Sequence, residues 1–156
     1  MGSKEDIEKY ILRLLSQRDY TAAMLKQKLA LKGYPASESE EAINKIEKLY
    51  PFDDEGYAVK WINYRCDNKP VGGTRLVREL IQKGVKAATA REIVLRQLPR
   101  EKEQKLLEEL VTKIIRRNQA HVDSYQKAAR LLGAKLQRRG FAREDIESCL
   151  NKIFPD

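Results

Sequence analysis

A stretch of ten residues that occurs three times decides the fold of this chain: LKQKLALKGY at residues 25–34, LVRELIQKGV at 76–85 and LGAKLQRRGF at 132–141. Each copy has two leucines four residues apart, followed by a basic residue, a glycine and an apolar residue. The glycines lie 51 and 56 residues apart in a chain of 156 residues. A period of about fifty residues is typical of repeat proteins, which form extended arrays rather than one globule around a central pocket. The pattern therefore favours a binding surface over an enzyme cleft.

The residues around the repeated stretch predict helices and no sheet. Apolar residues return at helical spacing, as in segment 4–16, where Ile7, Ile11 and Leu14 fall on one face. We expect nine helices, among them 4–16, 87–98, 100–117 and 143–153. They divide into three units of three helices, with boundaries at 4–51, 52–98 and 99–156. The predicted fold class is all-α, with three tandem three-helix repeats that form an elongated, curved array.

Capping residues mark where these helices begin and end. Thr21 is expected as the N-cap of the second helix, and Ser37 with Glu40 has the spacing of a capping box at the third. A glycine ends the second helix of each unit, because glycine tolerates the left-handed conformation found just after a helix. The chain can then turn, so that the third helix packs back over the second. The three glycines are Gly33, Gly84 and Gly140.

The positive charge of the chain is unevenly distributed. The net charge is +8, divided as −2 over residues 1–56, +6 over 57–98 and +4 over 99–156. A strongly basic region favours a nucleic acid or an acidic protein surface as the partner. The alternative is a lysine-rich protein whose charge only keeps it soluble.

No set of residues in the sequence suggests catalysis or metal binding. His121 is the sole histidine, and two isolated cysteines, Cys66 and Cys149, form neither a zinc motif nor a disulfide framework. Gly72-Gly73 lacks the spacing of a phosphate-binding loop. We therefore expect a non-enzyme that uses no metal and no cofactor. The sequence shows no signal peptide and no long apolar run, which favours a cytoplasmic protein without a membrane partner.

Basic residues in the second and third units are the candidate contact residues. Arg75 and Arg78 share one face of the fifth predicted helix, which ends at Gly84, opposite the Leu76 and Leu80 stripe. Such a strip can follow phosphates or acidic side chains, although charged helix faces are often only solvated. The full candidate set is Arg65, Lys69, Arg75, Arg78, Lys83, Lys127, Arg130, Lys135, Arg138 and Arg139.

Two aromatic residues near this strip have different expected roles. Trp61 lies four residues after Tyr57 on an apolar stripe, a position that favours core packing over base stacking. Tyr64, closer to the 67–74 loop, is the better candidate for an exposed contact.

The chain resembles the RecX family of bacterial recombination regulators. The resemblance rests on the three Leu-x-x-x-Leu-x-x-basic-Gly copies, on FDDEGYA at 52–58, on RLVRELIQKGV at 75–85 and on RRGF at 138–141. It spans about residues 7–154. One stretch departs from the family pattern: KPVGG at 69–73 stands where a basic-Gly-Tyr-Gly-Pro turn is usual, so the aromatic residue of that turn is missing.

The resemblance implies a function by binding. RecX-like proteins bind RecA and its nucleoprotein filament, lie in the filament groove, and inhibit ATP hydrolysis, strand exchange and co-protease activity. A monomer with RecA and the RecA–DNA filament as partners is the expectation for this chain. Two alternatives stay open: a direct regulator of helix-turn-helix type that binds single- or double-stranded DNA, and an adaptor for another acidic protein.

Overall fold

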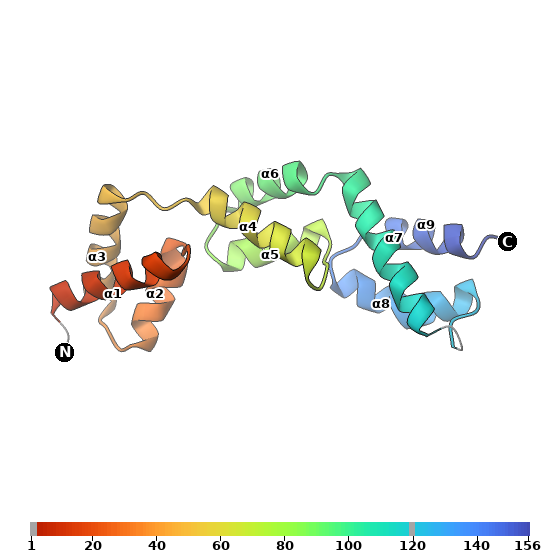
Figure 1. Cartoon of the computed structure of the whole chain (residues 1–156), viewed down its shortest axis with the longest axis horizontal. Helices are drawn as coiled ribbons and strands as arrows, with labels where there is room; N and C mark the ends of the chain where they lie inside the picture. Colours follow the sequence, from red (N-terminus) through yellow and green to blue (C-terminus); the bar gives the residue numbers. More distant parts are fainter. Residues whose placement is uncertain (1–2, 119–120) are drawn as a thin grey trace.

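The fold is built from helices alone in the part of the chain that the structure, a computed structural model, describes: residues 3–118 and 121–156. The elements are α1 (Lys4–Gln17), α2 (Ala22–Leu31), α3 (Ala36–Leu49), α4 (Asp54–Asp67), α5 (Gly73–Gln82), α6 (Ala87–Gln97), α7 (Arg100–Arg117), α8 (Tyr125–Arg138) and α9 (Arg143–Ile153). Figure 1 shows them as three groups that follow one another along the long axis: α1–α3, α4–α6 and α7–α9. The all-α prediction is confirmed for these residues.

Each group has its own hydrophobic core, and the repeated leucines lie at its centre. The three clusters of buried side chains share no residue, and each draws on all three helices of its group. Each leucine is 0 or 1% exposed, so each contributes about 1.5–3 kcal/mol by leaving water. The three pairs are Leu25 with Leu29, Leu76 with Leu80, and Leu132 with Leu136.

The three glycines end their helices as the sequence predicted. Their φ angles are +91° at Gly33, +96° at Gly84 and +90° at Gly140, in the left-handed region. The residue after each glycine donates its N–H to the carbonyl of the second leucine of the pair, at 3.1, 3.0 and 3.2 Å. This six-residue closure is the Schellman motif, which turns the chain sharply toward the third helix.

Of the two helix starts predicted from capping residues, the structure confirms one. Thr21 is the N-cap of α2, and its side chain accepts a hydrogen bond from the N–H of Met24. The capping box expected at Ser37 and Glu40 is wrong, because α3 begins at Ala36 directly after Pro35. The extended backbone of Pro35 (φ −61°, ψ 143°) already leads into the helix, so Ser37 lies inside its first turn.

The predicted helix 100–117 places the connection between α7 and α8 near Asn118 and Gln119. Asn118 is the C-cap of α7, whereas Gln119 lies outside the described residues. The eighth helix begins at Tyr125, and Ser124 is its N-cap. His121, the sole histidine of the sequence, is exposed in the turn before it.

The second helices of the three groups meet end to end. The Thr21 hydroxyl at the start of α2 donates to the carbonyl of Lys83 at the end of α5. The N–H of Gly72 at the start of α5 donates to the carbonyl of Arg139 at the end of α8, at 2.7 Å. Each contact joins a helix C-terminus to a helix N-terminus, so the partial charges that meet are opposite. The groups are therefore joined at helix ends, and α2, α5 and α8 form one row on the lower side of Figure 1.

No helix of the described ranges 3–118 and 121–156 is both long and apolar enough to cross a membrane.

Candidate binding groove

A groove follows the row of second helices. One part, of about 760 Å³, lies between α5 and α8, and a second part, of about 530 Å³, lies between α2 and α5. The two parts adjoin because Glu79 and Gln82 line both. We call the whole the second-helix groove. Its α5–α8 part is lined by Arg75, Arg78, Glu79, Gln82, Ala134, Gln137 and Arg138.

The same face of each second helix lines this groove. In α2 the lining positions are Met24, Gln27, Lys28 and Leu31, which lie nine, six, five and two residues before Gly33. In α5 they are Arg75, Arg78, Glu79 and Gln82, which lie nine, six, five and two residues before Gly84. In α8, Ala134 and Arg138 lie six and two residues before Gly140, and Gln137, which lies three residues before it, also lines the groove. This spacing puts each set on one helix face, so the groove repeats with the glycine motif.

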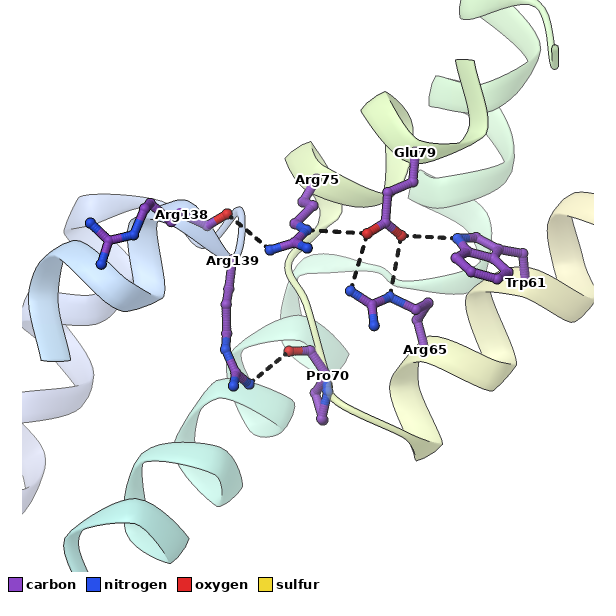
Figure 2. A network of polar contacts seen from close by, with 7 residues as sticks. All are labelled: Trp61, Arg65, Pro70, Arg75, Glu79, Arg138 and Arg139. Carbon is purple, nitrogen blue, oxygen red and sulfur yellow. Dashed lines mark hydrogen bonds and ion pairs between the residues drawn. The ribbon is translucent and has the colours of Figure 1, made fainter. Parts of the chain in front are cut away.

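A largely buried carboxylate, Glu79, organises the middle of the groove (Figure 2). Glu79 accepts hydrogen bonds from Trp61 Nε1 at 3.0 Å, from two nitrogens of Arg65 at 3.1 and 3.2 Å, and from Arg75 Nε at 3.1 Å. The side chains of Arg65 and Glu79 are only 13% and 16% exposed. Two arginines thus compensate one carboxylate, and the groove keeps a net positive charge.

The same cluster ties the second group to the third. Arg75 also donates to the carbonyl of Arg138, at 3.4 Å, and Arg139 donates back to the carbonyl of Pro70, at 3.3 Å (Figure 2). At the start of α5, a carboxylate oxygen of Glu103 accepts the N–H of Gly73 at 2.7 Å. Burial raises the pKa of Glu103, and the hydrogen bond from Gly73 opposes that shift. The start of α5 is therefore fixed by residues of α7 and α8.

The structure brings together four of the ten predicted contact residues. Arg75, Arg78 and Arg138 line the α5–α8 part of the groove. Lys83 lines the α2–α5 part, where its ammonium lies 4.1 Å from the centre of the Trp61 ring.

The other six predicted residues lie elsewhere or serve the fold. Arg65 is held in the Glu79 ion pair, and Arg139 donates to the carbonyl of Pro70, so both have partners within the chain. Lys127 pairs with Asp123 at 2.8 Å. Exposed positions outside the lining are taken by Lys69, Arg130 and Lys135.

Several lining residues are not among the predicted contact residues, because they carry no positive charge. Glu79, Gln82 and Gln137 line the α5–α8 part, and Met24 and Leu31 line the α2–α5 part. Their fixed distances before the three glycines are a signal that would have found most of them. The two aromatic residues lie where the sequence predicts them. Trp61 is half-buried against the core of α4–α6, and Tyr64 is 56% exposed.

The two cysteines have the properties of packed side chains. Burial raises the pKa of the Cys149 thiol to about 11 and also raises the pKa of Cys66. Residues 3–118 and 121–156 include no cluster of three or more histidine, cysteine, aspartate or glutamate residues that could hold a metal ion.

We therefore expect Cys149 to react slowly with iodoacetamide in the native protein. A thiol is protonated below its pKa, so a pKa of about 11 makes the thiolate fraction at pH 8 about a hundredfold smaller than that of an ordinary cysteine. Mass spectrometry of each modified cysteine, with and without denaturant, measures the two rates. Denaturant should bring both cysteines to the rate of a free thiol. Equal native and denatured rates at Cys149 would contradict its burial.

Comparison with known proteins finds matches to two models of one protein family. Residues 9–45 match the family model described as RecX, first three-helix domain, and residues 53–93 match RecX, second three-helix domain. The regulatory protein RecX of Trichlorobacter lovleyi is 30% identical over 156 residues, which cover 97% of this chain and 99% of that protein. The one from Streptomyces coelicolor is 29% identical over 131 residues, 84% of this chain and 68% of that protein.

Two solved structures share the fold. A crystal structure of regulatory protein RecX superposes with a TM-score of 0.80 at 20% identity and covers 94% of this chain and 70% of that one. The crystal structure of RecX from Lactobacillus salivarius gives a TM-score of 0.76 at 20% identity and covers 96% of both chains. At this identity the likeness concerns the fold alone.

Proposed function

The chain belongs to the RecX family, and from this premise we propose that it inhibits RecA by binding RecA and its nucleoprotein filament through the second-helix groove. The observation that carries the proposal is the groove itself. Its lining comes from the corresponding faces of α2, α5 and α8, which follow one another in an elongated row. A repeated face fits a repeated partner such as a filament. Occupation of the filament groove would hinder ATP hydrolysis, strand exchange and co-protease activity together.

The proposal includes the finer architecture. Three tandem repeats, at 4–51, 52–98 and 99–156, form a curved array that contacts successive protomers. The three separate cores and the three equivalent glycine ends support this division. The protein acts by binding and not by catalysis, as a cytoplasmic monomer that needs no metal and no cofactor.

The charge of the groove supports an anionic partner. Arg78 and Arg138 are exposed in its α5–α8 part and pair with no carboxylate of the described residues. This part joins the two segments whose net charges are +6 and +4. Unpaired guanidinium groups suit phosphates and carboxylates, both of which they can bind with two hydrogen bonds.

The combined change Arg78→Ala with Arg138→Ala tests this surface. We expect the affinity for RecA–single-stranded DNA filaments to fall about tenfold or more, because two charge-assisted contacts are lost. If both arginines contact phosphates, the slope of log affinity against log salt also becomes shallower by about two. Fluorescence anisotropy with labelled filaments at several salt concentrations measures both quantities.

A matched control is Arg91→Ala with Arg116→Ala. These two arginines are exposed, one on α6 and one on α7, and lie outside the groove. The control removes the same charge from the same two segments. An equal loss of affinity in both double variants would show that net charge, and not the groove, attracts the filament.

The inhibitory function is tested by RecA's ATP hydrolysis on single-stranded DNA. The chain is titrated from far below one molecule per RecA protomer up to equal amounts. Inhibition at low ratios supports action on growing filaments, and inhibition only near equal ratios supports coating of the groove. Unchanged hydrolysis, with intact filaments and a folded chain, contradicts the proposed function.

Direct DNA binding is the second candidate, because Arg78 and Arg138 suit phosphates as well as carboxylates. It predicts strong binding to DNA without RecA, with a steep loss of affinity as salt rises. Binding that depends on RecA contradicts it.

A further inference from the structure

The two ends of the second-helix groove differ in chemistry. The α5–α8 end carries Arg75, Arg78 and Arg138 with two glutamines. The α2 end carries Met24 and Leu31, next to the rings of Tyr20 and Trp61. Equivalent positions on the same helix face are therefore polar in one group and apolar in another: Met24 corresponds to the basic Arg75, and Leu31 to the neutral, polar Gln82.

Leu31 is unusually accessible for a residue in a hollow. It is 79% exposed, the largest value among the exposed large apolar side chains of the described residues. A single exposed leucine is common on protein surfaces and has no meaning alone. Leu31, however, shares a hollow of about 530 Å³ with the half-buried side chains of Met24 and Trp61. Met24 and Leu31 form an apolar floor that an inserted side chain could cover.

Cations surround this apolar floor. Arg18, Lys28 and Lys83 line the same hollow, and the only carboxylate among its lining residues is Glu79. Glu79 is already compensated by Arg65 and Arg75. The free charge at the α2 end is therefore positive, which suits carboxylates next to an apolar side chain.

The Trp61 ring does not serve as a platform for a nucleobase. The Lys83 ammonium lies over the ring, 4.1 Å from its centre, and the indole N–H is used by Glu79. A base would have to displace that cation before it could stack. Moreover, the accessible apolar groups are the aliphatic side chains of Met24 and Leu31, which favour a protein side chain over a base.

We propose that the α2 end of the groove binds an acidic protein segment, with an apolar side chain of that segment against Met24 and Leu31 and its carboxylates facing Lys28 and Lys83. This inference rests on the proposed function: the segment belongs to RecA, while the α5–α8 end faces the phosphates of the DNA. The groove is thus divided into a protein-binding end and a phosphate-binding end.

The test compares Leu31→Ser with the matched control Leu95→Ser. Leu95 lies on α6 outside the groove and is 72% exposed, so both changes remove an exposed leucine from a helix. Three probes are used with the full chain: RecA without DNA, a bare oligodeoxythymidine, and RecA filaments on the same oligonucleotide. Circular dichroism checks that both variants keep the helical content of the unchanged chain.

We expect Leu31→Ser to lower the affinity for the RecA-containing probes about tenfold and to leave oligonucleotide binding unchanged. Leu95→Ser should alter neither, and Arg78→Ala with Arg138→Ala should weaken oligonucleotide binding.

If the unmodified chain binds RecA and Leu31→Ser binds it equally well, the inference is overturned, while the proposed function stands. Loss of oligonucleotide binding by Leu31→Ser also overturns it and assigns the α2 end to nucleic acid. An unmodified chain that binds neither form of RecA contradicts the proposed function, and the inference with it.

Discussion

Gly84→Ala and Gly140→Ala are expected to destabilise the protein far more than Gly33→Ala, although alanine is equally strained at all three positions. Each glycine has a φ angle between +90° and +96°, where alanine costs about 1–2 kcal/mol. A side chain at Gly33 would meet nothing within 4 Å. At Gly84 its Cβ would lie 2.4 Å from the Cβ of Ala23, and at Gly140 it would lie 2.5 Å from the backbone nitrogen of Arg75.

The difference arises from the end-to-end joints between the groups. Gly84 and Gly140 are the points where α5 meets α2 and α8 meets α5, so an added methyl group forces two backbones apart. Such overpacking costs about 1–3 kcal/mol beyond the local strain. We therefore expect Gly33→Ala to lower the free energy of unfolding by about 1–2 kcal/mol, and each of the other two changes by about 2–5 kcal/mol.

Gly33→Ala is the matched control, since it carries the same backbone strain without the clash. Thermal unfolding followed by circular dichroism compares the stabilities, and small-angle X-ray scattering follows the maximum dimension of the particle. Gly84→Ala and Gly140→Ala should change that dimension, because the groups move relative to one another. If all three variants have the same stability and shape, the close joints are absent in solution.

These joints also show where sequence reasoning stops. The glycine ends follow from local chemistry: a basic residue, a glycine and an apolar residue after a leucine pair predict a Schellman turn wherever they occur. Nothing local says that the turn of one group packs on the helix start of another. Thr21 could be predicted as an N-cap, for example, but its second partner is the carbonyl of Lys83, 62 residues away. Local rules predicted the helices, and only the tertiary structure gives the joints.

The residues of the candidate site also fall into two kinds: those that local sequence predicts and those that depend on tertiary contacts. Arg75, Arg78 and Arg138 could be selected from charge and helical spacing, because an exposed helix face is a local property. Arg65 could not be told from them, since its burial depends on Glu79, which lies 14 residues along the chain on another helix. Leu31 was hidden for a different reason: a leucine in a leucine-rich stretch suggests the core, whereas the structure exposes it in the groove.

Glu79→Ala is expected to cost about 3–5 kcal/mol in the free energy of unfolding, as when one partner of a buried ion pair is removed. The change leaves the guanidinium of Arg65, 13% exposed, without its carboxylate, and leaves the indole N–H of Trp61 without an acceptor. Urea denaturation measures the loss without adding salt that would screen charges. The matched control is Glu55→Ala, which breaks the exposed ion pair with Arg96 and should cost no more than about 1 kcal/mol. Equal costs in the two variants would mean that the Glu79 cluster is not held in solution.

The same variant separates charge from geometry in binding. Glu79→Ala makes the groove more positive by one charge, so attraction to phosphates alone predicts tighter binding to an oligonucleotide. It also frees Arg75, which then no longer positions its guanidinium at the carbonyl of Arg138. If filament binding requires a fixed spacing between α5 and α8, the affinity for filaments should fall while the affinity for the oligonucleotide rises. A rise in both would mean that the filament is attracted by the charge of the groove and not by its shape. Because Glu55→Ala removes the same charge outside the groove, it shows how much of either change is due to net charge alone.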